Sequence, residues 1–278
     1  GKVVDTLIMT ATPIPRTLSL TLYGDLDVSI IDEMPPGRKE IKTFTLKHTR
    51  AKEVYKFVKD QIIENGDQAY IVYPLIEQSD QINAKAAEDM YEKLSKEAFA
   101  DIPMGLLHGR MSDFEKNEVM SKFVKGEIKI LVSTSVIEVG VDVPNATIMV
   151  IENAERFGLA QLHQLRGRVG RGSKQSYCFL IVSEAGEEAW DRLQFFASTT
   201  DGFKVAEYDM RLRGPGEFFG TRQHGMMDFK VADLISDSEL IMLAREDAKW
   251  IIENRAESSI IKKVFELYGD RIKLLDVG

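Results

Sequence analysis

Residues Met104–Ser133, MGLLHGRMSDFEKNEVMSKFVKGEIKILVS, decide the fold class of this chain. The stretch opens with the β-rich run MGLL and closes with KILVS, and apolar residues recur every three or four positions across 113–124 between them. Ser112 and Glu115 have the spacing of a capping box, which predicts that the helix begins directly after Ser112. A strand, a helix and a second strand in this order predict one βαβ unit of a parallel sheet.

The same alternation continues on both sides of this unit, from about residue 41 to residue 182. The expected strands are 41–47, 68–73, 104–107, 129–133, 147–151 and 176–182, and the expected helices are 51–64, 83–98 and 113–124. The pattern predicts one open α/β domain with a parallel sheet over residues 41–183.

The two flanks of this domain differ from it in composition. Proline-rich breaker clusters at 11–16 and 34–38 predict that residues 1–40 are the tail of a preceding domain and a linker. After residue 183 the strands stop, and residues 184–278 are expected to be mainly helical. Helices are expected at 184–197, 234–254 and 258–268. Residues 211–223 combine three glycines and a proline with three arginines, and this composition predicts a loop.

Composition and charge limit the classes of protein to which this chain can belong. Its 278 residues are 44% hydrophobic and 29% charged, which indicates one or two folded domains and excludes a disordered or low-complexity chain. The 36 basic and 44 acidic residues give a net charge of −8. This balance excludes a general polyanion-binding surface, so any contact with nucleic acid must be local.

The sequence also indicates a compartment. The single cysteine, Cys178, lies in the apolar run 177–182 and cannot form an internal disulfide, so we expect a buried thiol in a reducing environment. No apolar stretch approaches the roughly 18 residues of a membrane span, and residues 1–20 lack the features of a signal peptide. The expected location is the cytoplasm, with no membrane partner.

The segment 161–171, QLHQLRGRVGR, contains three arginines within six residues, separated by glycines. Glycines let the backbone approach a partner closely, and clustered guanidinium groups favour an anion. Arg168 and Arg171 are therefore candidates for a phosphate clamp that stabilises charge during phosphoryl transfer. The alternative interpretation is a solvated basic helix end.

The segment 133–144, STSVIEVGVDVP, follows an expected strand and turns into a short helix. Hydroxyl groups at the carboxyl end of a strand and free amides at a helix start can bind an anion, and Asp142 could accept a hydrogen bond from a sugar hydroxyl. The alternative is an ordinary turn between a strand and a helix.

Taken in chain order, three segments resemble the motifs of superfamily 2 helicases. Residues 9–16 resemble motif III, residues 133–144 resemble motif V, and residues 161–171 resemble motif VI. The versions at 10–18 and 155–172, and the expected loop at 211–223, are similar to segments shared by the RecG and Mfd families, in which the loop is a translocation motif. Residues 23–38 and 214–223 resemble the RecG family in particular. The resemblance extends over nearly the whole chain.

The resemblance implies an ATP-dependent double-stranded DNA translocase, or helicase, that uses magnesium. It would remodel branched DNA, such as stalled replication forks and Holliday junctions, in recombination and repair. Residues 41–183 would be the second RecA-like domain, and the chain would be the C-terminal part of the whole protein.

Two motifs of that family are absent from the sequence. It contains neither a Gly-x-x-x-x-Gly-Lys-Ser/Thr phosphate loop nor an Asp-Glu-x-His box after a strand. We therefore expect no ATP or metal on this chain and no hydrolysis by it alone. Its partners would be branched DNA and, from the same protein, the first RecA-like domain and an N-terminal wedge domain.

The resemblance also implies roles for individual residues. Arg168 and Arg171 would be arginine fingers, and the ATP cleft would be lined by Gly140, Asp142 and Gln164. DNA phosphates would contact His108, Gly109, Arg110 and Thr134, and coupling of ATP hydrolysis to DNA movement would involve Arg211, Arg213, Arg222 and Gln223. Alternatively, the arginines after residue 210 pair with nearby acidic side chains on an ordinary surface. The alternatives for the whole chain are an Mfd-like translocase that acts with RNA polymerase and a non-catalytic module that binds nucleic acid or a protein.

Overall fold

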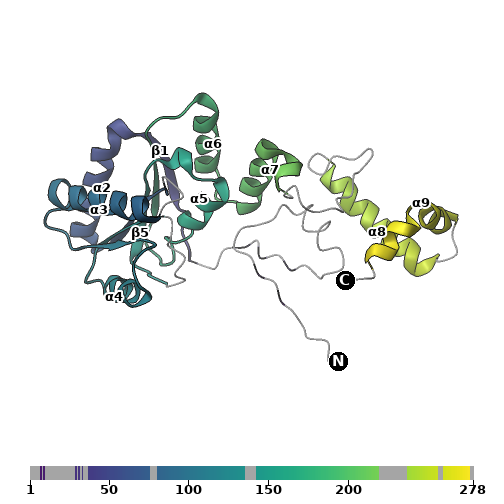
Figure 1. Ribbon diagram of the computed structural model, residues 1–278, viewed down its shortest axis with the longest axis horizontal. Coiled ribbons are helices and arrows are strands. Elements are labelled where there is room, and N and C mark those ends of the chain that lie inside the picture. Colours follow the sequence, from purple (N-terminus) through teal and green to yellow (C-terminus); the bar gives the residue numbers. More distant parts are fainter. Residues whose placement is uncertain are drawn as a thin grey trace. The chain divides into compact units, whose positions relative to one another are not determined.

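The computed structural model describes residues 37–75, 80–134, 142–218, 237–255 and 259–275, and the single residues 7, 9, 29, 31 and 33 (Figure 1). The chain divides into two compact units. Asp209 is the last residue of the first unit, and Met210–Gly278 belong to the second.

The first unit is built on a six-stranded sheet in which every strand runs parallel to its neighbours, in the order β1-β6-β5-β2-β4-β3. The strands are β1 (Lys42–Lys47), β2 (Gln68–Tyr73), β3 (Met104–Leu107), β4 (Ile130–Thr134), β5 (Ala146–Ile151) and β6 (Tyr177–Val182). Parallel neighbours need long crossover connections, and helices are the usual form of these. The predicted α/β class with a parallel sheet is confirmed.

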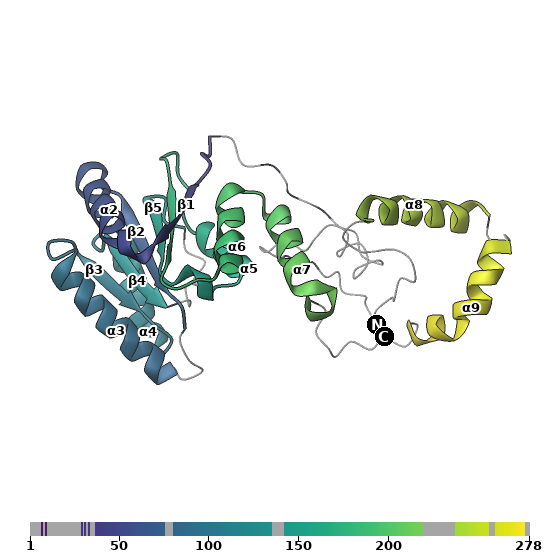
Figure 2. The same ribbon diagram turned by 90° about the horizontal axis from the view of Figure 1, so that it is seen from above.

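Helices cover both faces of this sheet. They are α2 (Ala51–Asn65), α3 (Asp80–Glu97), α4 (Asp113–Val124), α5 (Leu159–Arg166) and α6 (Glu187–Ser198), with 3-10 turns η1 (His48–Arg50) and η2 (Ala154–Arg156). Tyr70 and Val72 of β2 pack in a core with residues of α4, α5 and α6, whereas Ala69 and Ile71 pack with residues of α2 and α3. Figure 2 shows α2 on one side of the sheet and α5 and α6 on the other. Every residue of β2, β4 and β5 is buried, as expected for strands covered on both faces.

Local signals determine where two of the helices begin or end. The Ser112 hydroxyl accepts a hydrogen bond from the Glu115 amide (3.3 Å), and the Glu115 carboxylate accepts one from the Ser112 amide (2.8 Å). The predicted capping box is therefore present at the start of α4. Helix α2 ends at Gly66, whose φ of 68° is left-handed and favours glycine.

The single cysteine lies where the sequence places it. Cys178 of β6 is fully buried, and burial raises the pKa of its thiol to about 12, against the opposing charge of Arg166. The predicted buried thiol is confirmed.

The packed first unit extends past the boundary predicted at residue 183. Helix α6 contributes Leu193 and Phe196 to the core beneath α5, so the unit continues to Asp209. The reason is that α6 has an apolar stripe that needs an apolar partner, and the sheet with its helices supplies one.

The loop predicted over 211–223 is wrong for residues 211–218. These residues belong to helix α7 (Gly202–Phe218), whose first turn is capped by Asp201, with the Phe203 amide 2.9 Å from its carboxylate. A helix that has begun adds each further residue at low cost, so the glycines and proline weaken α7 without ending it before Phe218.

The second unit contains the end of α7 and the helices α8 (Ser238–Asn254) and α9 (Ser259–Leu275). Helices were predicted in both regions, and α9 continues further than the predicted 258–268. Leu243 and Trp250 of α8 and Leu267 of α9 are exposed. Within the described residues, no helix is both long and apolar enough to cross a membrane.

A buried carboxyl group lies directly after β5. Glu152 is only 2% exposed, and it accepts a hydrogen bond of 2.5 Å from the Tyr55 hydroxyl of α2. Burial raises the pKa of Glu152, and the hydrogen bond from Tyr55 opposes this rise. The folded chain therefore binds this proton more tightly than the unfolded chain does.

Replacing Glu152 with glutamine should reduce the loss of stability at high pH. Because the pKa is raised in the folded state, the contribution of Glu152 to stability is full below its unfolded pKa of about 4.3 and is lost as the pH rises through the folded value. Glu152→Gln keeps the shape and an acceptor for Tyr55 but cannot ionise. The midpoint of thermal unfolding should therefore fall less between about pH 4.5 and pH 8 in the variant than in the natural chain.

The control for this prediction is Glu53→Gln. Glu53 is an exposed glutamate of α2 whose pKa is lowered by its hydrogen bond with Arg50, so its removal should have a small effect of opposite sign. An unchanged pH dependence in Glu152→Gln would show that the buried carboxyl is not its source.

Candidate functional site

The parallel sheet places the predicted site residues at two opposite edges. Asp142 precedes β5, and Arg168 and Arg171 precede β6, so these three lie at the edge where strands begin. Thr134 ends β4 and His108 follows β3, so these lie at the edge where strands end. Thr134 and Asp142, which the sequence interpretation placed in one anion site, therefore lie at opposite edges of the sheet.

At the first edge, the structure brings Arg171 and Asp142 together. A guanidinium nitrogen of Arg171 lies 3.6 Å from the Asp142 carboxylate, and its Nε donates to the Gly167 carbonyl at 3.4 Å. Arg168 is half-buried nearby. Burial raises the pKa of Tyr70 to about 12, and the charges of Arg171 and Arg168 both act against this rise. The two arginines thus both place positive charge near Tyr70 of β2.

Glycines let the two turns of this edge approach each other. A Cβ on Gly172 would lie 2.9 Å from the carbonyl oxygen of Pro144, closer than side chains tolerate. Gly170 has a φ of +75°, and a Cβ there would lie 2.9 Å from Ile41. The turn after α5 therefore packs against Pro144, in the segment that contains Asp142, because residue 172 is glycine, and against Ile41 because residue 170 is glycine.

The other residues predicted near ATP differ in what the structure shows. Gln164 is exposed on α5, with no described contact to Asp142 or Arg171. Gly140 lies outside the described residues. Arg166, the third arginine of the segment, is 3% exposed and faces the protein interior instead of this edge.

At the opposite edge, the residues predicted to contact DNA lie on neighbouring strands. Leu107 of β3 pairs with Ser133 of β4, so His108 and Thr134 follow at the same level. Gly109 and Arg110 are exposed, while His108 is half-buried, with Nε2 3.5 Å from the Glu88 carboxylate.

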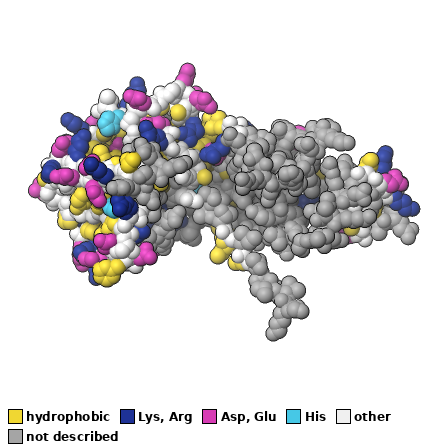
Figure 3. Space-filling model, in the orientation of Figure 1, with side chains coloured by type: hydrophobic (Ala, Val, Ile, Leu, Met, Phe, Trp, Pro, Cys, Tyr) yellow, Lys and Arg dark blue, Asp and Glu magenta, His cyan; other side chains and the backbone are white. Residues whose placement is uncertain are grey.

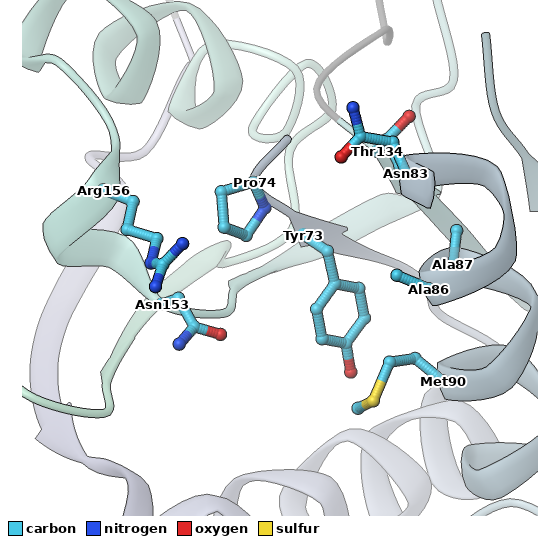
Figure 4. A pocket seen from close by; sticks show the side chains of 9 residues that line it. All are labelled: Tyr73, Pro74, Asn83, Ala86, Ala87, Met90, Thr134, Asn153 and Arg156. Atoms are coloured by element: carbon cyan, nitrogen blue, oxygen red, sulfur yellow. The ribbon is translucent and has the colours of Figure 1, made fainter. Parts of the chain in front are cut away.

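Thr134 lines a cavity of about 130 Å³ at this edge (Figure 4). The cavity lies between the ends of β2 and β4, helix α3 and the turn after β5. Its lining residues are Tyr73, Pro74, Asn83, Ala86, Ala87, Met90, Thr134, Asn153 and Arg156. The buried Thr134 hydroxyl has no hydrogen-bond partner among the described residues. A ligand or water in the cavity could satisfy it.

Asn153 and Arg156 were not predicted from the sequence. Asn153 has a left-handed φ of 49°, and its side chain donates to the Ser183 hydroxyl at 2.9 Å. The signal for both residues was available, because polar residues directly after a buried parallel strand lie at the edge where α/β proteins bind ligands.

The residues predicted for coupling are described only in part. Arg211 and Arg213 are exposed on α7, and Arg222 and Gln223 lie outside the described residues. On the face of the first unit seen in Figure 3, basic and acidic side chains are interspersed, in line with a local rather than general nucleic-acid site. In the described part of the chain, no group of three or more His, Cys, Asp or Glu residues could bind a metal.

Comparison with known proteins agrees with the fold and with the order of the segments. Residues 52–173 match the model of the helicase conserved C-terminal domain, and residues 199–275 match that of the ATP-dependent DNA helicase RecG, domain 3, C-terminal. The chain is 58% identical over its whole length to the ATP-dependent DNA helicase RecG of Thermotoga maritima, of which it covers 34%. It is 50% identical to that of Bacillus subtilis, over 92% of this chain and 37% of the relative.

A solved structure of RecG bound to a three-way DNA junction is similar to this chain. It matches 87% of this chain with a TM-score of 0.69 and 59% identity, and the match covers 31% of that protein. The chain spans about a third of the length of the curated relatives it matches. On this identity and on the order of the two matched models, the chain belongs to the RecG family and corresponds to the C-terminal region of its members.

Proposed function

We propose that this chain is the second RecA-like domain and the helical C-terminal region of an ATP-dependent translocase on double-stranded DNA. The whole protein would remodel branched DNA, such as stalled forks and Holliday junctions, in recombination and repair. The observation that supports this most directly is the grouping of Arg168, Arg171 and Asp142 at one sheet edge of a chain 58% identical to a RecG helicase. The relatives from Thermotoga maritima and Bacillus subtilis are bacterial proteins, and bacterial DNA lies in the cytoplasm, so we infer that location.

Arg171 makes a weak interaction that a phosphate could replace. The Arg171 side chain is 24% exposed and that of Asp142 is 63% exposed, and an ion pair with such exposure contributes about 0–1 kcal/mol. A guanidinium group that meets a phosphate in a closed cleft makes stronger, bidentate hydrogen bonds. Exchange of the carboxylate for a nucleotide phosphate is therefore favourable.

The two arginines fit the anionic charge of ATP. Arg168 and Arg171 would meet the γ-phosphate of ATP bound to the first RecA-like domain, with Gly140, Asp142 and Gln164 lining the cleft. ATP supplies the phosphoanhydride bond whose hydrolysis drives movement. Positive charge on the transferring phosphoryl group stabilises the transition state, and one arginine finger is worth roughly 10³ to 10⁵ in rate.

Magnesium is expected with ATP, but it has no fitting ligand set among the described residues of this chain. The carboxylate at the proposed cleft, Asp142, is paired with Arg171. The described residues therefore do not fit a magnesium site.

The opposite edge would contact the DNA backbone. Gly109 and Arg110 are exposed there, Thr134 has an unsatisfied hydroxyl, and Arg156 lines the adjoining cavity. Short side chains and backbone amides bind phosphates without reading sequence, which suits a protein that moves along DNA. The match to RecG domain 3 supports branched DNA over the Mfd-like alternative, which would instead require RNA polymerase.

This chain alone should neither hydrolyse ATP at a significant rate nor bind it tightly. The reason is that its sequence contains no phosphate loop to bind the β- and γ-phosphates. The measurement is DNA-stimulated ATP turnover of the purified chain beside the whole protein, with circular dichroism to show that the chain is folded. Substantial turnover by the chain alone would overturn the proposed position of the cleft.

Arg168→Ala or Arg171→Ala in the whole protein should lower ATP turnover by about a hundredfold or more while nucleotide binding is largely retained. The charge acts mainly in the transition state, so kcat falls more than affinity. Arg→Lys should also fail, because an ammonium group lacks the planar fork. Arg50→Ala, which removes an exposed arginine paired with Glu53, is the control and should leave turnover normal. Normal turnover in either finger variant would exclude that residue from the role.

Arg213→Ala in the whole protein should retain most DNA-stimulated ATP turnover but lose most unwinding of a branched DNA. Arg213 belongs to the second unit, whereas the residues proposed to meet ATP belong to the first, so its loss should interrupt transmission and spare hydrolysis. Lys204→Ala, which removes an exposed cation nearer the start of α7, is the matched control. Equal loss of turnover and unwinding, or no loss of either, would contradict a coupling role.

A further inference from the structure

Lys174 lies three residues after Arg171 and makes contacts that the proposed ATP chemistry does not use. Its Nζ donates to the Asp67 carboxylate at 2.6 Å and to the Asn65 carbonyl at 2.9 Å. The Asp67 side chain is only 5% exposed, whereas that of Lys174 is 43% exposed. Asn65 is the last residue of α2, and Asp67 directly precedes β2. Lys174 therefore attaches the turn of Arg171 to the connection between α2 and β2.

Both acceptors favour a cation at this place. The carbonyl of Asn65 belongs to the last turn of α2, where carbonyl groups lack partners in the helix and the helix dipole is negative. Asp67 is a buried carboxylate, and burial of such a group is costly unless it is paired and hydrogen-bonded. Removal of the lysine ammonium would therefore leave the Asp67 carboxylate without the cation that pairs with it here.

The same connection between α2 and β2 also holds the segment of Asp142. The Gln68 amide donates to the carbonyl of Asn145, three residues after Asp142, at 2.8 Å. Lys174 and Asn145 thus attach two different segments to neighbouring residues of one connection. The relative position of Arg171 and Asp142, whose charged groups lie 3.6 Å apart, is therefore constrained by both attachments.

We infer that Lys174, through its ion pair with Asp67, positions the turn of Arg171 for the hydrolysis of ATP. The inference rests on the proposed function, to which it adds a positioning residue that acts through Arg171 and not on the phosphates. A misplacement of about 1 Å in a catalytic group can lower a rate by about a hundredfold, so a small displacement of the turn is enough to slow the reaction.

The first test is Lys174→Met in the whole protein. Methionine has a side chain of similar length but donates no hydrogen bond, so the turn loses its attachment. The kcat for ATP should fall by about tenfold while KM changes by less than about threefold, because the arginine acts mainly in the transition state. Lys174→Arg can still pair with Asp67 and should keep most of the turnover. An unchanged kcat in Lys174→Met would overturn the inference.

A double-mutant cycle tests whether Lys174 acts through Arg171. In a protein that already carries Arg171→Ala, there is no guanidinium group left to position, so Lys174→Met should lower kcat no further. A second fall of the same size in that background would show that Lys174 acts independently of Arg171, and the inference would be wrong.

A loss of stability is separated from a loss of position by removing both charges. Lys174→Met alone leaves a buried carboxylate without its cation and should lower the midpoint of thermal unfolding of the whole protein. Adding Asp67→Asn removes that charge and should recover the midpoint, while kcat stays low because the turn is still unattached. Recovery of kcat together with the midpoint would show a role in stability alone and would overturn the inference.

The matched control is Lys59→Met. Lys59 of α2 also pairs with a carboxylate distant in the sequence, that of Asp101 at 3.7 Å, but this pair does not include the turn of Arg171. Lys59→Met should leave kcat normal, and an equal fall in this variant and in Lys174→Met would contradict a positioning role. Normal turnover in Arg171→Ala would overturn the proposed finger and the positioning with it. Low turnover in Arg171→Ala beside normal turnover in Lys174→Met would overturn the positioning alone.

Discussion

The constraint on which the rest of this structure depends is the common direction of its strands. Because all six run parallel, every strand begins at one edge of the sheet and ends at the other, and each connection must cross between them. Residues that precede strands, such as Asp142 and Arg171, are thereby separated from residues that follow strands, such as Thr134. One domain can thus present two different surfaces, one proposed for nucleotide and one for DNA, without either interfering with the other.

Burial assigns different roles to arginines that the sequence places side by side. Arg166 is buried, and its donors are satisfied by the carbonyls of Phe196 and Thr199. Arg171, five residues later, is partly exposed and makes only a weak ion pair with Asp142. A strongly bound arginine is a fixed point, and a weakly bound one is free to exchange partners. The segment therefore combines a rigid attachment and an adaptable cation within one short turn.

Much of the first unit could be predicted because its local signals agree with its packing. The capping box at Ser112 predicts the start of α4, and the apolar runs predict the strands. The structure has the sheet that these strands imply, and the bounds of α4 are as predicted. Prediction failed at α7, because a helix that has begun continues at low cost and here runs through a Gly-Pro-Gly segment that weakens it. Spacing predicted the arginine cluster but not the separation of Asp142 from Thr134, because sequence distance does not show which edge a residue reaches. Nor did it distinguish Arg166, since burial depends on α6, which follows later in the chain.

The segment from the end of β5 to Arg171 connects the cavity at one edge of the sheet with the arginine turn at the other. It begins with Asn153 and Arg156 at the cavity, crosses the sheet as α5, and ends at the arginine turn. Arg192 attaches its start to α6, and Arg166 attaches its end to the same helix. Because α6 is held at both points, α5 and α6 form one packed pair over this face of the sheet. In a domain whose proposed sites lie at opposite edges, these two arginines, one buried and one half-buried, hold both ends of the segment between the edges against one helix.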